Sequence, residues 1–222
     1  MHRRTALSVS AVLLAAAPLL TACSGETRPG TAAVVGGERI TTSALQAQVG
    51  DVRAAQSTSE QGAQLIGATA GLERLKLNKM IQSAVLERAA EDAGLSVSPK
   101  EVQDVRKAQL EQLGGEKELR DAALQQAQLA PGQIEADTRF KLLRDKLFAH
   151  YGSQDKALAK LGEAAKALHI EVNPRYGHWD AQQILLGDQE TPWITQRTRP
   201  VGSAGAAAEA EAGVSFTPRT YP

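Results

Sequence analysis

Cysteine, aromatic residues and net charge are all scarce in this sequence. The 222 residues include one cysteine, and only 4% of them are aromatic. A single cysteine excludes an intramolecular disulfide and a cysteine metal cluster, so a packed core has to stabilise the fold. The formal net charge is zero, and no basic stripe is formed by Arg139, Arg144, Arg197 and Arg199. The sequence therefore predicts no nucleic acid among the partners.

Motifs that mark an active site are also missing. The sequence has no HExxH, GxSxG or GxGxxG motif and no phosphate-binding loop, and His150, His169 and His178 lack the spacing of metal ligands or of a catalytic triad. Neighbouring acids such as Glu91 and Asp92 fit the solvated face of an amphipathic helix better than an acid–base pair. We predict that the protein is not an enzyme and uses neither a cofactor nor a metal.

The first 23 residues contain basic, apolar and small residues, in that order. His2-Arg3-Arg4 is followed by an apolar run from Ala11 to Leu20, and Leu-Thr-Ala then precedes Cys23. The run is well short of the roughly 20 residues that a membrane-spanning helix needs. We predict that residues 1–22 are a cleaved lipoprotein signal peptide. Cys23 would then carry the lipid, including palmitate, that holds the protein on the extracytoplasmic face of the cell membrane. The alternative is an ordinary buried thiol at Cys23.

Composition divides the remaining chain into three parts. Residues 23–31 are polar and contain glycine and proline, which predicts a flexible tether. The domain is predicted at 32–180 and begins with two short strands around Gly36-Gly37, a pair that can adopt the positive φ of a tight turn. Residues 181–222 contain an Ala/Gly/Glu stretch and are predicted to form a low-complexity, disordered tail.

Helical spacing of apolar residues dominates the predicted domain. The strongest pattern includes Leu77 and Val85 on one face, and Leu75 widens it beyond a single stripe, which predicts a central helix. Ser98 and Glu101 have the spacing of a capping box at the start of the next helix. Helices are predicted at 41–55, 72–93, 98–113, 117–129, 134–151 and 153–168, with a loop and a weak helix at 56–71.

We predict a mainly α fold of the α+β class, with about six helices and one small sheet. The strand near Val34 would pair with an extended segment near Ile170 that returns after the last helix. The following residues, Asn173–Asp180, are predicted to form a turn in which Tyr176 and Trp179 hold the chain against the helices. A recognition site in this turn is the alternative.

Three stretches then occur in an informative order. They are AAVVGGERIT at 32–41, LNKMIQSAVLERAAEDAGLSVSPKEV at 77–102 and, after the helices of 115–147, IEVNPRYG at 170–177. Their order and spacing resemble the N-terminal chaperone domain of SurA-type periplasmic chaperones and PrsA-type foldases. Gly36 stands where asparagine is usual in that family. The resemblance covers about residues 32 to 180.

The resemblance implies ATP-independent binding of unfolded or newly exported polypeptides in a helical cradle. Many relatives carry a parvulin prolyl-isomerase domain before the returning strand. Here about twenty residues separate Tyr151 from Ile170, whereas a compact domain needs about fifty or more, so the isomerase is predicted to be missing. The alternatives are an interaction lipoprotein with one dedicated envelope partner and, less favoured, a residual prolyl isomerase.

The few aromatic residues are the candidates for client binding. Exposed aromatic side chains are natural anchors for a bound peptide, whereas buried ones contribute to the core. The sequence leaves both alternatives open for these residues. The candidates are Phe140, Phe148, Tyr151, Tyr176 and Trp179.

Overall fold

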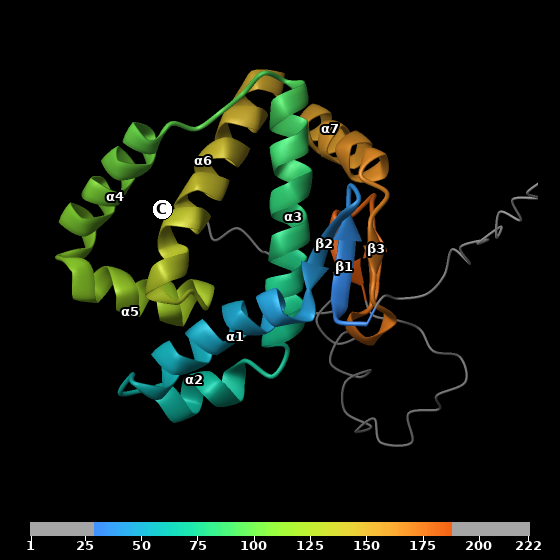
Figure 1. The fold of residues 1–222 in the computed structure, drawn as a ribbon. Helices are drawn as coiled ribbons and strands as arrows, with labels where there is room; N and C mark the ends of the chain where they lie inside the picture. The colour runs from blue at the N-terminus through green and yellow to red at the C-terminus, as the bar shows by residue number, and fades with distance from the viewer. Residues whose placement is uncertain (1–28, 188–222) are drawn as a thin grey trace, which may run out of the picture.

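The computed structural model describes residues 29–187. Helices make up most of this range, and a small sheet lies on one side of it, next to α3 and α7 (Figure 1). The predicted mainly α fold with a small sheet is confirmed. The helices are α1 (Thr42–Ser57), α2 (Gly62–Ala68), α3 (Leu72–Asp92), α4 (Pro99–Leu113), α5 (Glu116–Ala127), α6 (Ile134–Tyr151) and α7 (Gln154–Ala167), with 3-10 turns η1 (Pro131–Gln133) and η2 (Pro174–Tyr176). The strands are β1 (Thr31–Val35), β2 (Glu38–Thr41), β3 (Glu171–Val172), β4 (His178–Asp180) and β5 (Leu185–Gly187).

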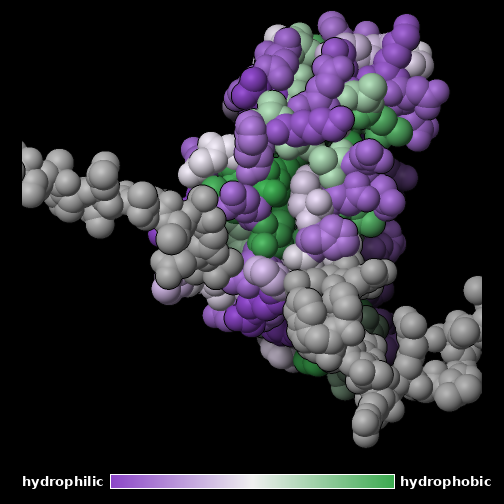
Figure 2. Space-filling view, turned by 90° about the vertical axis from the view of Figure 1, so that its right-hand side faces the viewer, coloured by the Kyte–Doolittle hydropathy of each residue, from purple (hydrophilic) through white to green (hydrophobic). Residues whose placement is uncertain are grey.

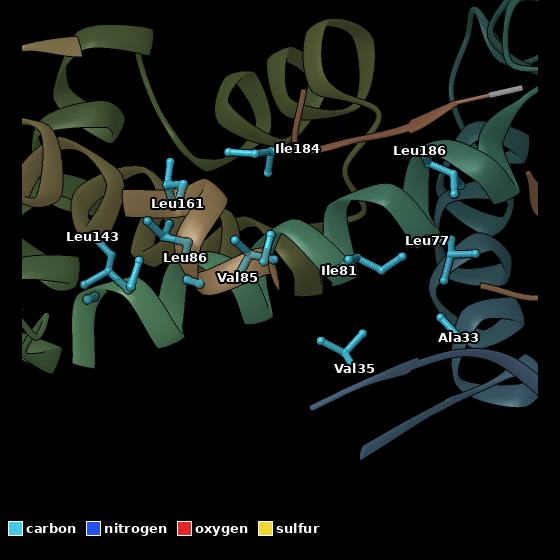
Figure 3. Close-up of a cluster of buried hydrophobic side chains, with 14 of the residues drawn as sticks. Ala33, Val35, Leu77, Ile81, Val85, Leu86, Leu143, Leu161, Ile184 and Leu186 are labelled. Atoms are coloured by element: carbon cyan, nitrogen blue, oxygen red, sulfur yellow. The ribbon is translucent and has the colours of Figure 1, made fainter. Parts of the chain in front are cut away.

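The core is built around α3. Leu77 and Val85 of this helix are fully buried, and α3 contacts α1, α6, α7, β1 and β5. Side chains from other elements converge on α3, among them Val35, Leu143 and Leu161 (Figure 3). The predicted central helix is therefore present, and it supplies the surface on which the surrounding elements pack.

The main sheet joins the two ends of the domain. β1 lies in the middle and pairs antiparallel with β2 and β3, with Val34 opposite Arg39 on one side and Glu171 on the other. Gly36 and Gly37 have φ of 59° and 84°, so the turn between β1 and β2 uses the conformation that favours glycine. The predicted pairing of the N-terminal strand with the returning segment is confirmed.

One side of the molecule carries both α7 and the main sheet. On this side, hydrophobic residues are exposed as a patch between polar ones (Figure 2). The described helices include none that is long and apolar enough to span a membrane.

Two segments are more ordered than the sequence predicted. Residues 56–71 contain a defined helix, α2, because Arg53 of α1 donates to the hydroxyl of Thr69 at 2.7 Å and to its carbonyl at 2.8 Å. The fold also extends past residue 180, where the tail was predicted to begin. Residues 181–187 form a turn and β5, with Ile184 and Leu186 buried. The predicted signal peptide, residues 23–28 of the predicted tether and residues 188–222 lie outside the described residues, and the last residue of the tether, Thr31, begins β1.

The N-terminus of α4 has the predicted capping box. The Ser98 hydroxyl accepts from the Glu101 amide, and a Glu101 carboxylate oxygen accepts from the Ser98 amide at 2.9 Å. Lys146 of α6 donates to the other Glu101 oxygen at 2.6 Å. Its hydrogen bond, followed by those from Ser98, lowers the pKa of Glu101 to about 2. The cap therefore also attaches α4 to α6.

Replacing Ser98 with alanine tests this cap. We expect Ser98→Ala to lower the free energy of unfolding by about 1 kcal/mol, the usual effect of losing an N-cap. Urea denaturation followed by circular dichroism measures the change. Ser96→Ala is the control, since Ser96 is exposed and only its backbone carbonyl bonds to Lys146. Equal losses in the two variants would contradict a specific role for the cap.

Candidate functional site

Two cavities adjoin each other beside α1. The first, here called the α1–α5 cavity, has a volume of about 610 Å³ and is lined by α1, α5 and η1. The second, the hairpin cavity, has a volume of about 370 Å³ and lies between the β1–β2 hairpin, α3, η1 and α6. Gly132 of η1 lines both cavities. The two cavities therefore meet at the 3-10 turn.

The 3-10 turn is held in place by buried groups on both sides. Leu129 and Ala130 precede it and are buried, and Pro131 begins it. The Gln133 amide donates to the Gln48 carbonyl of α1 at 2.9 Å, and its side-chain oxygen accepts from Lys76 of α3 at 2.6 Å. These bonds connect the turn to α1 and α3, so its backbone forms a fixed wall between the cavities.

The hairpin cavity has a largely apolar lining. Its apolar residues come from four elements and the segment that precedes η1, so no single helix face forms the surface. These residues are Val35, Ile40, Met80, Ala84, Leu129 and Ala136.

Lys76 is an unusual member of this cavity because it is only 5% exposed. Its ammonium group donates to the Gln128 carbonyl at 2.8 Å and to Gln133. Burial lowers its pKa to about 8, and the nearby carboxylate of Asp137 opposes that shift. Both acceptors can be satisfied in either protonation state, because a neutral amine retains two N–H donors and an ammonium group has three.

A second cluster of charge lies beside the cavity. Asp137 accepts from Lys79 at 3.1 Å and from Lys141 at 2.7 Å. Burial alone would raise the pKa of Asp137, but the hydrogen bonds and charges of the two lysines outweigh it and lower the pKa. The Lys79 ammonium also lies 3.4 Å from the centre of the Phe140 ring. The cavity therefore combines apolar residues with an ion-paired cluster at its edge, in which two lysines share one carboxylate.

The five predicted aromatic residues do not form one surface. Phe140, Phe148 and Tyr151 lie on α6, half-buried against the core, and Tyr151 also lines a separate cavity of about 250 Å³. Tyr176 in η2 is buried at 3% exposure, and Trp179 in β4 packs against the same core. In the described part of the chain, none of them lines the α1–α5 or the hairpin cavity. The turn interpretation of Asn173–Asp180 agrees with the burial of Tyr176.

The groups that line the two cavities suit non-covalent binding. Across residues 29–187, no group of three or more His, Cys, Asp or Glu side chains is arranged to hold a metal ion. The cavities offer apolar area, backbone carbonyls and a few paired charges. Such surfaces bind apolar groups by removing them from water.

Comparison with known proteins places this fold in a family. A family model described as the SurA-like N-terminal domain matches residues 3–148. The chain belongs to the SurA-like N-terminal domain family. This family is associated with chaperone function, and the domain itself is non-catalytic. No parvulin domain is detected. No curated protein and no solved structure matches the chain.

The family match includes every residue that lines the two cavities. It ends within α6, so α7, β3, β4 and β5 lie outside it, although the resemblance in sequence was predicted to reach residue 180. Sequence reasoning missed the cavities because their walls come from distant segments. The one local signal was Pro131-Gly132, which was interpreted only as the end of a helix.

The buried amine of Lys76 makes stability depend on pH. The pKa of Lys76 in the folded state, about 8, lies below its value of 10.5 in the unfolded state. Between pH 8 and 10.5 the unfolded state therefore binds more protons than the folded state. The free energy of unfolding rises with pH in that range. Between pH 7.5 and 9.5 we expect the natural chain to gain about 1 to 2 kcal/mol relative to Lys76→Met. Urea denaturation at the two pH values measures this difference.

Lys100→Met is the matched control. Lys100 is fully exposed, and the hydrogen bond that it donates to Asp104 raises its pKa, so its effect on stability is lost only above pH 10.5. This variant should keep the rise in stability between pH 7.5 and 9.5. If Lys76→Met keeps the rise as well, the depressed pKa of Lys76 is wrong.

Proposed function

We propose that this protein is an extracytoplasmic, ATP-independent chaperone that binds unfolded or newly exported polypeptides. One observation carries the proposal: two adjoining, partly apolar cavities that share Gly132, within a domain of a chaperone-associated family. The protein would act by binding alone, without a covalent step.

The dimensions of the cavities support binding of polypeptide side chains. Volumes of about 610 and 370 Å³ lie in the range of roughly 300–1,000 Å³ that is usual for ligand pockets. Because the cavities meet at one turn, two apolar side chains of the same extended segment can enter them together. Burial at about 25 cal/mol per Å² of apolar area makes such binding favourable and reversible.

The charges around the cavities support a broad choice of clients. Arg120 and Asp121 of α5 line the first cavity together with Asp51 of α1, and Lys79 with Asp137 lines the second. Both signs are present at each cavity, so neither favours a client of one charge. Selection would depend on exposed apolar segments, which unfolded chains present and folded chains bury.

Filling the junction of the cavities tests the proposal. A side chain at Gly132 meets open space, with nothing within 4 Å of an added Cβ. We expect the natural chain to suppress light scattering by several unrelated unfolding proteins without ATP. Gly132→Trp should remove about half of this suppression or more, because Gly132 lines both cavities and a bulky side chain there obstructs their junction.

Gly67→Trp is the matched control. Gly67 on α2 also has open space around an added Cβ and lines neither cavity. This variant should suppress scattering as well as the natural chain does. No suppression of any client by the natural chain would reject the general chaperone and favour the interaction lipoprotein with one envelope partner. Equal activity of the two variants would exclude these cavities as the client site.

Lipid anchorage through Cys23 is the second part of the proposal. The basic, apolar and small residues before Cys23 support it, and they lie outside the described residues. Cells grown with radiolabelled palmitate should label the natural chain and the control Ser24→Ala, but not Cys23→Ser. Labelling of Cys23→Ser at the natural level would reject the anchor site.

A further inference from the structure

The last described strand, β5, and the preceding residue, Ile184, are bound to α3 through their backbone as well as through buried side chains. Asn78 of α3 accepts from the Leu186 amide at 2.9 Å, and Gln82 donates to the Ile184 carbonyl at 2.8 Å. Arg74 donates to the Leu186 carbonyl at 3.4 Å. These three side chains lie four residues apart along one face of α3. They bind main-chain atoms, which every polypeptide presents.

The other side of β5 pairs with β4. The two strands are antiparallel, with Trp179 opposite Leu186 and Asp180 opposite Leu185. We call the space between the Arg74–Asn78–Gln82 face of α3 and β4 the β5 slot. Its two walls satisfy the backbone of one extended segment from both sides, which is how sheet edges bind peptides by strand addition.

Side chains of the segment alternate between buried and exposed. Ile184 and Leu186 are 9% and 6% exposed, whereas Leu185 between them is 43% exposed. Ile184 and Leu186 project toward the side chains of α3 (Figure 3). The slot therefore favours apolar residues at alternate positions. It makes little contact with the side chain between them, which is exposed.

The far end of the slot is narrow. A Cβ added to Gly187 would lie 2.8 Å from the His178 ring, and one added to Gly177 would lie 2.1 Å from the Gly187 carbonyl oxygen. The position after the second apolar residue therefore favours glycine, because a larger residue there would have to displace the exposed ring of His178. Together these contacts define a pattern of apolar, any, apolar and glycine.

The segment Ile184–Gly187, which fills the slot in this structure, is held under backbone strain. Ile184 has φ of 53°, in the left-handed region that a β-branched residue rarely adopts. The segment is connected to β4 by a turn in which the Asp180 carboxylate accepts from the amides of Gln182 and Gln183. It also follows every strand of the main sheet in the chain, so it can leave without unpairing that sheet.

We propose that the β5 slot is a binding site for extended client segments with this pattern, and that Ile184–Gly187 occupies it as a built-in competitor. The proposal rests on the proposed function, because it takes unfolded polypeptide as the ligand. A client that adopts an unstrained backbone displaces the segment. The occupied slot thereby keeps the apolar surface of α3 covered when no client is bound.

A reversible crosslink tests the competition. Asp180 and Leu185 face each other across β4 and β5, so cysteines at both positions can join the strands. The probe is a fluorescein-labelled peptide of residues 181–187, AQQILLG, and AQQSLSG is the control peptide. We measure fluorescence anisotropy with the full chain in nanodiscs. The oxidised Asp180→Cys/Leu185→Cys chain should bind AQQILLG about tenfold more weakly than the same chain after reduction.

Weakening the natural segment should have the opposite effect. We expect Ile184→Ser/Leu186→Ser to bind the probe about tenfold more tightly than the natural chain. A factor of about ten corresponds to a natural segment that occupies the slot about nine-tenths of the time. Leu185→Ser is the matched control and should leave affinity unchanged, because its side chain is exposed. Adding Asn78→Ala to the double variant should abolish the gain.

The outcomes separate this proposal from the proposed function. Equal binding by the oxidised and reduced crosslinked chains would overturn the competition, and so would equal binding of the two peptides. Suppression of light scattering, measured on the same samples, reports the chaperone function independently. If suppression persists and responds to Gly132→Trp, the chaperone proposal stands without the slot. If the natural chain suppresses nothing, the chaperone proposal fails, whatever the peptides show.

Discussion

Burial of α3 on several sides is the constraint on which the other elements depend. Leu77, Ile81 and Val85 recur at steps of four and are fully buried, so helices α6 and α7 and the main sheet have to pack against one stripe of this helix. Small neighbours such as Ala89 and Ala90 are also buried and allow close approach. The domain can exclude water here without a disulfide, because the helix presents apolar area over most of its length.

The remaining faces of α3 have different roles. Lys76, Lys79 and Met80 line the hairpin cavity, while Asn78 and Gln82 bond to the backbone of the segment Ile184–Gly187. Polar groups on a buried helix are costly unless they are hydrogen-bonded. Here they find partners in backbone carbonyls and amides of segments far away in the chain. The need to hydrogen-bond polar groups on a buried helix thus places side chains on α3 that bind main-chain atoms.

Prediction from the sequence succeeded where short-range interactions decide the structure. The capping box at Ser98, the turn at Gly36-Gly37 and the end of α6 at Tyr151 all depend on residues within four positions of each other. Prediction was weaker for α2 and β5. Their own residues carry little periodicity, and both form because distant side chains, Arg53 for α2 and Gln82 for β5, satisfy their backbones or their ends.

By itself the sequence determined the mainly helical class, the central helix and the order of elements that marks the family. The spacing of apolar residues and the helix caps that indicate these features are local properties of the sequence. Only the tertiary structure decided which residues of that helix are exposed: Leu75 is 45% exposed and Lys76 is 5% exposed, the reverse of their polarity. Tertiary contacts also created the cavities and the β5 slot. The bond from Leu186 to Asn78 joins residues 108 positions apart, and no local pattern encodes which distant segments meet in space.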